Sequence, residues 1–290
     1  TSPMTEAPPL ARYAVIGNPI AHSRSPQIHA LFSQQTGKPL RYERLLAPVD
    51  GFAEAAAAFV ADGGLGLNVT VPFKLEAYAL AAGRLSARAR LAGAVNTLSW
   101  RDGAWHGCNT DGVGLVSDLL RLGVRLNGAS VLVVGAGGAA RGVLQPLAEA
   151  GCARLHIVNR TAAKALALAD AWRDTGVSPQ TRVTAGGLGD AALAGGWNLV
   201  VNATASGLQD AAPDLPAGLY ADGAAGYDMM YGAQPTAFMK QAQADGAALT
   251  ADGLGMLVGQ AAESFFIWHG VRPDPAPVLA ALREALMAGR

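Results

Sequence analysis

The chain has 290 residues, enough for one large domain or, as we expect, for two domains of ordinary size. Its 22 Lys and Arg residues balance its 22 Asp and Glu residues, which argues against nucleic acid or an anionic membrane as a partner. Apolar residues make up 51% of the chain and glycines number 36, a composition typical of a tightly packed α/β protein and not of a disordered one. We therefore expect a small molecule as the partner.

The cysteines and the N-terminal segment indicate the cellular compartment of the protein. Cys108 and Cys152 lie far apart without His or Cys at ligand spacing, so we expect neither a disulfide nor a structural metal site. Thr1 to Pro9 contains no apolar stretch, and the longest uncharged window, 191–209, is broken by glycines and polar residues. These features predict a cytoplasmic protein without a membrane span.

Short apolar segments alternate with helical ones from Arg12 onward. YAVIG and GLNVTV are predicted strands, and Ser25 to Thr36 and Phe52 to Ala61 are predicted helices. This alternation is typical of βαβ units. A further helix is expected after Asp111. Its predicted apolar stripe consists of Val113, Val116, Leu119 and Leu120.

The segment NVTVPFK, from Asn68 to Lys74, ends a predicted strand in a charged amine. Its valines alternate with Asn68 and Thr70, so a strand would bury both valines on one face and project the amide and hydroxyl from the other. Pro72 ends the strand pairing, which leaves Lys74 just past the strand end, where functional loops lie. On this segment alone, a solvated lysine that opens the next helix is the more common outcome.

A nucleotide-binding unit is predicted from ASVLVVGAGGAARGVLQPLAEAG, residues 129–151. A strand over 131–134 leads through a glycine-rich turn into a helix, and a second strand, RLHIVNR, follows at once. Gly135, Gly137 and Ala140 match the dinucleotide-binding fingerprint, with alanine at the third small position. Gly135 permits the tight turn, Gly137 admits the pyrophosphate, and Ala140 lets the helix pack on the strand.

The pyrophosphate is expected at the N-terminus of this helix, where free amides and the helix dipole favour an anion. Ala136, Gly138 and Ala139 complete the predicted turn. Further strands are expected over 197–204 and around 218–229. We therefore predict a Rossmann-type domain over about 111–253.

The end of the second strand, VNRTAAK, indicates which cofactor binds. NAD sites of this fold place an acidic residue there for the ribose 2′-hydroxyl, whereas NADP sites place a cation. Between the end of this strand at Asn159 and Asp170, the chain contains no Asp or Glu. We predict NADP, with solvated basic residues at a helix start as the alternative. The expected cofactor contacts here are Asn159, Arg160, Thr161 and Lys164.

Several short segments outside the nucleotide-binding unit remain to be explained: GNPIAHSRSPQIH with Ser23 and Ser25, NVTVPFK with Lys74, AGAVNT and GCNTDG with Asn96 and Asp111, and ADGLGMLVGQA with Gln260. Together, and in this order along the chain, they resemble the shikimate dehydrogenase family. The resemblance covers nearly the whole chain from about Tyr13. It implies reversible NADPH-dependent reduction of 3-dehydroshikimate to shikimate, a step of chorismate and aromatic amino-acid biosynthesis. It also implies a substrate domain over 1–110, completed by C-terminal helices over 254–290, and a nucleotide domain over 111–253.

The resemblance also implies roles for individual residues. Lys74 would donate a proton to the alkoxide that forms at C3, while Asp111 orients the amine. Ser23 and Ser25 would hold the substrate carboxylate, and a helix cap at Ser25 before Pro26 is compatible with that role. Asp111 taken alone is typical of a helix N-cap. The other implied substrate contacts are Asn68, Thr70, Asn96, Tyr231 and Gln260, and Met229 and Gly253 are implied contacts of the cofactor.

Two alternatives stay open. The quinate/shikimate dehydrogenases accept NAD and a second substrate, but they usually carry an acidic residue where this chain has Thr161. A non-catalytic metabolite sensor would not need both Lys74 and Asp111, and the chain has no appended DNA-binding segment. We expect a monomer or homodimer whose interdomain cleft closes on its ligands.

Overall fold

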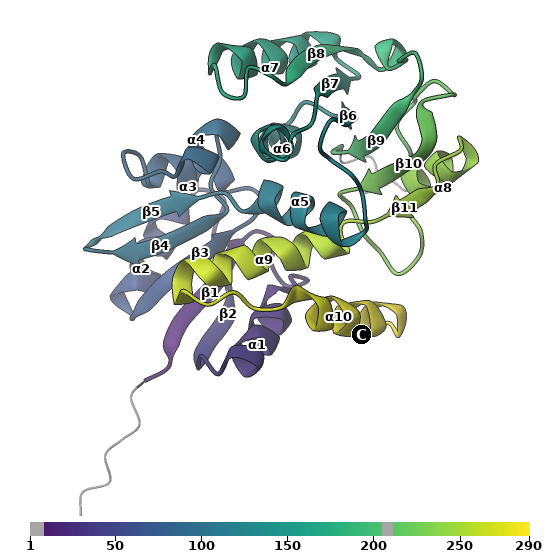
Figure 1. Ribbon diagram of the computed structural model, residues 1–290. Helices are drawn as coiled ribbons and strands as arrows, with labels where there is room; N and C mark the ends of the chain where they lie inside the picture. Colours follow the sequence, from purple (N-terminus) through teal and green to yellow (C-terminus); the bar gives the residue numbers. More distant parts are fainter. Residues whose placement is uncertain (1–8, 205–210) are drawn as a thin grey trace, which may run out of the picture.

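The computed structural model describes residues 9–204 and 211–290, so all but the last residue of the Thr1 to Pro9 segment falls outside it. Two α/β layers lie on either side of a pair of crossing helices, α5 (Asp111–Arg121) and α9 (Leu254–His269) (Figure 1). Because α9 follows the second sheet in sequence but packs beside the first, the chain passes between the two halves twice.

The first domain is built on a five-stranded sheet in the order β2-β1-β3-β4-β5. β1 pairs in parallel with β2 and β3, while β4 runs antiparallel to both of its neighbours. The strands are β1 (Ala11–Gly17), β2 (Leu40–Leu46), β3 (Gly64–Val69), β4 (Thr97–Arg101) and β5 (Ala104–Cys108). The crossover helices α1 (Ser25–Thr36) and α2 (Phe52–Ala61) have the predicted bounds, and two short helices follow, α3 (Lys74–Leu80) and α4 (Ala87–Ala92).

The NVTVPFK segment departs from the predicted strand pattern after Val69. Asn68 and Val69 are both buried, whereas Val71 is 66% exposed, so the prediction that the two valines share a buried face is wrong. The physical reason is that β3 ends at Val69 and a turn follows, in which the Phe73 amide donates to the Thr70 carbonyl. Lys74 then opens α3 at the carboxyl end of the sheet.

The second domain contains a six-stranded parallel sheet in the order β11-β10-β9-β6-β7-β8. This is the strand order of a dinucleotide-binding fold, with the topological switch between β6 and β9. The strands are β6 (Ser130–Val134), β7 (Arg154–Asn159), β8 (Arg182–Gly187), β9 (Trp197–Asn202), β10 (Tyr220–Asp228) and β11 (Leu249–Ala251). The helices are α6 (Gly138–Glu149), α7 (Ala162–Asp174) and α8 (Ala237–Ala244), with a 3-10 turn, η1 (Leu188–Asp190). The predicted Rossmann architecture is confirmed.

The apolar stripe predicted for α5 is wrong in detail. Leu120 is 58% exposed, while the helix buries a face that contains two glycines, Gly112 and Gly114. A Cβ atom on Gly114 would lie 2.6 Å from the backbone nitrogen of Gln260, so the missing side chain lets α5 and α9 approach closely. Small residues, which contribute little to hydrophobic periodicity, therefore form this contact.

The C-terminal helices α9 and α10 (Pro275–Met287) return to the first domain, as predicted. Ile28 and Phe32 of α1 form one buried cluster with Val258 and Phe265 of α9 and Val278 of α10. Among the residues that the structure describes, no helix is long and apolar enough to cross a membrane. Over the same residues no group of His, Cys, Asp and Glu is arranged to hold a metal ion, and both cysteines are free and buried.

Candidate active site

A cavity of about 1070 Å³ lies between the two domains, and residues from both domains line it. It contains all nine predicted substrate-side residues: Ser23, Ser25, Asn68, Thr70, Lys74, Asn96, Asp111, Tyr231 and Gln260. From the predicted cofactor contacts it contains Ala136, Gly137, Gly138, Ala139, Lys164, Met229 and Gly253. The remaining predicted contacts, Gly135, Ala140, Asn159, Arg160 and Thr161, lie outside its lining.

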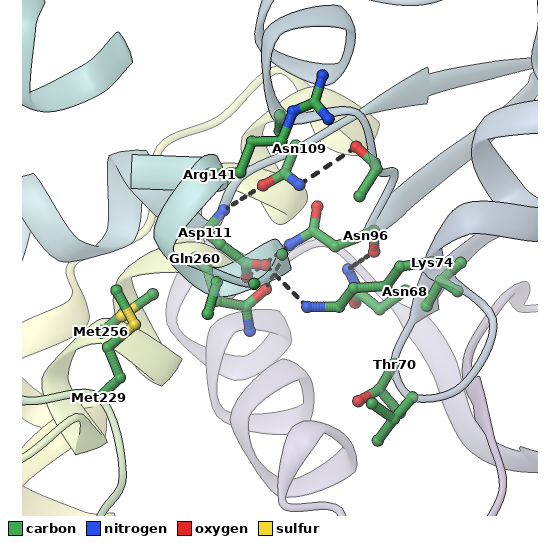
Figure 2. Close-up of a pocket in the computed structure, with 18 of the residues that line it drawn as sticks. Asn68, Thr70, Lys74, Asn96, Asn109, Asp111, Arg141, Met229, Met256 and Gln260 are labelled. Atoms are coloured by element: carbon green, nitrogen blue, oxygen red, sulfur yellow. Dashed lines mark hydrogen bonds and ion pairs between the residues drawn. The ribbon is translucent and has the colours of Figure 1, made fainter. Parts of the chain in front are cut away.

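Lys74 and Asp111 form an ion pair in this cavity (Figure 2). Lys74 Nζ lies 2.9 Å from Asp111 Oδ2, and the two side chains are 35% and 24% exposed. The interpretation of Asp111 as a helix cap is wrong, because Thr110 is the N-cap and Asp111 is the first residue of α5. Its carboxylate is therefore free to face Lys74.

Asn96 holds the other oxygen of Asp111. Its Nδ2 donates to Asp111 Oδ1 and to Thr110 Oγ1, both at 2.9 Å. Its Oδ1 accepts from the Thr110 backbone amide and from the Thr97 hydroxyl, also at 2.9 Å each. Asn96 is only 3% exposed, and these four bonds use its hydrogen-bonding groups within the protein.

Ser23 and Ser25 lie at the start of α1 on the cavity surface. The capping interpretation of Ser25 is wrong, because Arg24 is the N-cap position and Ser25 is already the first helical residue, which moves Pro26 to the second position. Ser23 Oγ instead accepts from the Ser25 backbone amide at 3.3 Å. Arg44, at the end of β2, donates from Nη2 to the Ser23 carbonyl at 2.7 Å and so holds this loop. Nothing in the sequence had singled out Arg44.

The glycine-rich turn has the geometry that a pyrophosphate requires. Gly135 has φ +116°, a conformation that favours glycine, and its amide donates to the Val158 carbonyl. A Cβ atom on Gly137 or Gly138 would meet no atom within 4 Å, so the backbone at the N-terminus of α6 is open on the cavity side. Ala140 is fully buried against the core. These residues fit the phosphates of a dinucleotide.

Gly253 lies where the chain leaves the second domain. A Cβ atom there would lie 2.0 Å from the Met229 carbonyl oxygen, so only glycine permits this approach. Met229 and Met256 lie together at the cavity in Figure 2, on the side away from Thr70. The predicted contacts Met229 and Gly253 are thus neighbours.

The two predicted cations, Arg160 just after β7 and Lys164 in the first turn of α7, line different cavities. Lys164 lines the main cavity, whereas Arg160 lines a smaller cavity of about 470 Å³ together with Leu188 and Asp214. Both side chains are exposed. Thr161 between them is the N-cap residue of α7, and Asn159 Nδ2 donates to the Thr161 carbonyl at 3.1 Å, which fixes the turn.

Arg141 is a cavity residue that the sequence analysis missed. It belongs to the first turn of α6, and its Nε donates to the Leu91 carbonyl of α4 at 3.4 Å, which links the second domain to the first. A cation near a helix N-terminus opposes the helix dipole, which is a signal that the sequence already contained. An anion bound at the same helix end would offset that repulsion.

Comparison with known proteins assigns the family. The family models "Shikimate dehydrogenase substrate binding domain", "Shikimate / quinate 5-dehydrogenase" and "Shikimate 5'-dehydrogenase C-terminal domain" match residues 15–98, 118–184 and 253–283. The NADP(+) shikimate dehydrogenases of Bordetella petrii and Bordetella avium are 76% and 67% identical over 98% of this chain and 99% of each relative.

A solved structure agrees with these sequence matches. The shikimate 5-dehydrogenase of Thermus thermophilus, determined in complex with NADP(H) and shikimate, superposes with a TM-score of 0.82 at 36% identity. The alignment covers 96% of this chain and 100% of that structure. The chain therefore belongs to the shikimate dehydrogenase family.

Proposed function

We propose that the protein catalyses the reversible reduction of 3-dehydroshikimate to shikimate with NADPH, with Lys74 as the general acid and base. The observation that carries this proposal is the Lys74–Asp111 pair, 2.9 Å apart, in a cavity lined by both the substrate-side loops and the dinucleotide-binding turn. The relatives named NADP(+) shikimate dehydrogenases, at up to 76% identity, support the same activity and cofactor.

The chemistry needs a hydride and a proton. NADPH supplies the hydride for C3 when it is bound. Lys74 Nζ donates a proton to the oxygen on C3 as negative charge develops there, and it takes that proton back in the oxidation direction. Asp111 stabilises the ammonium form and fixes the direction of the amine, while Asn96 Nδ2 keeps the second carboxylate oxygen in place.

Two groups of residues would recognise the substrate. Ser23 and Ser25 bind the carboxylate through their hydroxyls, with the loop braced by Arg44. Because the hydrogen-bonding groups of Asn96 are used within the protein, we propose that its main role is to hold Asp111, and direct contact with substrate stays a prediction. The residues proposed for the ring hydroxyls are Asn68, Thr70, Tyr231 and Gln260.

The second domain would bind the cofactor. The turn from Gly135 to Ala140 holds the pyrophosphate, and Met229 with Gly253 contacts the nicotinamide side. Asn159, Arg160, Thr161 and Lys164 would supply the hydrogen-bond donors and positive charges for the adenosine 2′-phosphate. We place the domain boundaries at 110/111 and 253/254, and we propose a cytoplasmic enzyme that acts as a monomer or homodimer.

An absorbance assay at 340 nm, a wavelength where NADPH but not NADP absorbs, tests this function. The purified protein is mixed with 3-dehydroshikimate and NADPH or NADH, and in the reverse direction with shikimate or quinate. We expect turnover that is much faster with NADPH and shikimate. Comparable rates with quinate and NAD would favour the quinate-type alternative, and ligand binding without turnover would favour the sensor.

A further inference from the structure

A chain of buried hydrogen bonds extends from the catalytic pair along the first sheet to its edge strand, β2. It starts at Asp111 and Asn96 and continues through Thr97 of β4 and Ser264 of α9 to Asn68 of β3. Tyr42 of β2 follows, where its hydroxyl lies 2.7 Å from Asn68 Oδ1. Thr97 and Ser264 are 1% and 0% exposed, so water cannot substitute for a missing partner.

At the Asp111 end of the chain, groups that can only donate or only accept fix the direction of each hydrogen bond. The backbone amide of Thr110 can only donate, so the Asn96 atom that it meets at 2.9 Å is Oδ1, and Nδ2 faces the carboxylate of Asp111. Because Asn96 Oδ1 can only accept, the Thr97 hydroxyl at 2.9 Å donates its single proton to it.

The same reasoning continues to the other end. Thr97 has no second proton, so in its 2.8 Å contact with Ser264 the serine hydroxyl is the donor. Ser264 in turn accepts from Asn68 at 3.0 Å, which assigns Nδ2 to that side of the amide. Oδ1 of Asn68 therefore faces Tyr42, whose hydroxyl donates to it. Each link determines the next, from Asp111 to Tyr42.

We propose that Thr97 and Ser264 are positioning residues that transmit the orientation of Asn96, which the Thr110 amide and Asp111 fix, to the amide of a second site residue, Asn68. The proposal rests on the proposed function and deepens it. Thr97 donates to Asn96 Oδ1 and must therefore accept from Ser264, and Ser264 in turn keeps the Asn68 amide from turning over at the cavity surface. Because Ser264 belongs to α9, 196 residues beyond Asn68, the substrate site acquires its donor and acceptor pattern only when α9 is docked.

Two substitutions at position 97 separate hydrogen bonding from packing. Thr97→Val keeps the shape and removes the hydroxyl, whereas Thr97→Ser keeps the hydroxyl and removes a methyl group. We expect Thr97→Val to raise KM for shikimate by about tenfold, with KM for NADP within about twofold of wild type, and Thr97→Ser to restore most of the loss. Ser264→Ala is expected to match Thr97→Val. The double variant should raise KM for shikimate about as much as either single variant does, because both substitutions break the same chain of hydrogen bonds.

A second measurement does not depend on activity. Exchange of the side-chain amide protons of Asn68 with solvent, followed by NMR, should be slow in wild type and Thr97→Ser and faster in Thr97→Val. Equal losses in Thr97→Ser and Thr97→Val, or equal rises in KM for both ligands, would show a packing role and overturn the inference. A wild-type protein inactive on shikimate, with this exchange pattern intact, would overturn the proposed function alone.

Discussion

At the scale of single residues, Lys74 shows how one position serves two roles. It begins α3, as a solvated lysine at a helix start would, and its amine also lies 2.9 Å from Asp111 Oδ2. The partner is 37 residues away in sequence and begins another helix. Both helices begin at the cavity, so their first residues meet there.

Replacement of Lys74 tests the proton donor. Lys74→Ala should lower kcat by at least about 10²-fold, because a positioned acid contributes about 10²- to 10⁴-fold in the transition state. KM for shikimate should change less. Lys38→Ala, at an exposed lysine, provides the control and should leave kcat unchanged. If Lys74→Ala kept more than about a third of wild-type kcat, Lys74 would have no catalytic role.

Asp111→Asn tests the partner of the lysine. The amide keeps the shape but removes the charge that stabilises the ammonium form, so steady-state kinetics should show a clear loss of kcat. Normal kcat with only reduced thermal stability would assign a purely structural role to Asp111.

Arg160 is expected to set the cofactor preference. A guanidinium meets the 2′-phosphate of NADP with two parallel hydrogen bonds, and NAD lacks that group. Arg160→Ala should therefore cost about 1.5 to 3 kcal/mol with NADP and little with NAD, a shift of about one to two powers of ten in the ratio of kcat/KM values. Arg160→Lys should reduce the preference for NADP by a smaller factor than Arg160→Ala does. Equal losses with both cofactors would indicate damage to the fold instead.

At the scale of elements, the contact between α5 and α9 shows why residue size matters as much as hydrophobicity. Gly114 of α5 lies against α9 beside Gln260, and Gly259 of α9 lies against the Gly114 backbone in return. The glycines allow the two helices to cross closely at the junction of the two domains. Because α9 also carries Gln260 and Ser264, this packing positions the site.

Gly114→Ala should lower the free energy of unfolding, because its Cβ would lie 2.6 to 2.7 Å from the backbone of Gln260 and Met256. Overpacking of this kind typically costs about 1 to 3 kcal/mol. The matched control is Gly142→Ala in α6, where the nearest atom would be at 4.0 Å and a gain of about 0.5 to 1 kcal/mol is expected from helix propensity. Urea unfolding of both variants measures the difference, and similar effects of the two substitutions would contradict the close-packing argument.

At the scale of the whole molecule, α9 and α10 complete the first domain from the far end of the chain. His29 of α1 lies in this junction, stacked on Tyr42 at 4.2 Å between ring centroids and close to Trp268 of α9. It is fully buried. Burial, and secondarily the charge of His269, lowers the pKa of His29 to about 3, while an interaction with the Asn68 side chain acts in the opposite direction.

The low pKa of His29 predicts acid lability. In the unfolded chain this histidine takes up a proton below about pH 6.5, whereas in the folded protein it stays neutral down to about pH 3. Its contribution to the free energy of unfolding is therefore fully present above about pH 6.5 and is lost as the pH falls toward about 3. From about pH 7.5 to about pH 5 this single group should remove about 2 kcal/mol. Over that pH range, the free energy of unfolding measured with urea should fall by correspondingly less in His29→Phe. The control His22→Gln, at an exposed position, should behave as wild type. An identical loss in His29→Phe would contradict the assignment.

The amino-acid sequence by itself determined the Rossmann unit, the bounds of α1 and α2, and NADP as the cofactor. Each of these depends on local patterns: hydrophobic period, glycine positions in one turn, and the residues that end one strand. The same local reasoning failed for the caps at Ser25 and Asp111, because each is the first helical residue and not the cap, and for the stripe on α5, because contact with α9 sets its buried face.

Only the tertiary structure decided which polar groups meet. Asn68 and Ser264 lie 196 residues apart, and Asn96 meets Asp111 across 15, yet their bonds fix one continuous chain of donors and acceptors. A sequence names the donors and acceptors but not their partners, because a buried hydrogen bond depends on distance and direction in space. The fold sets both when α9 closes over the first sheet.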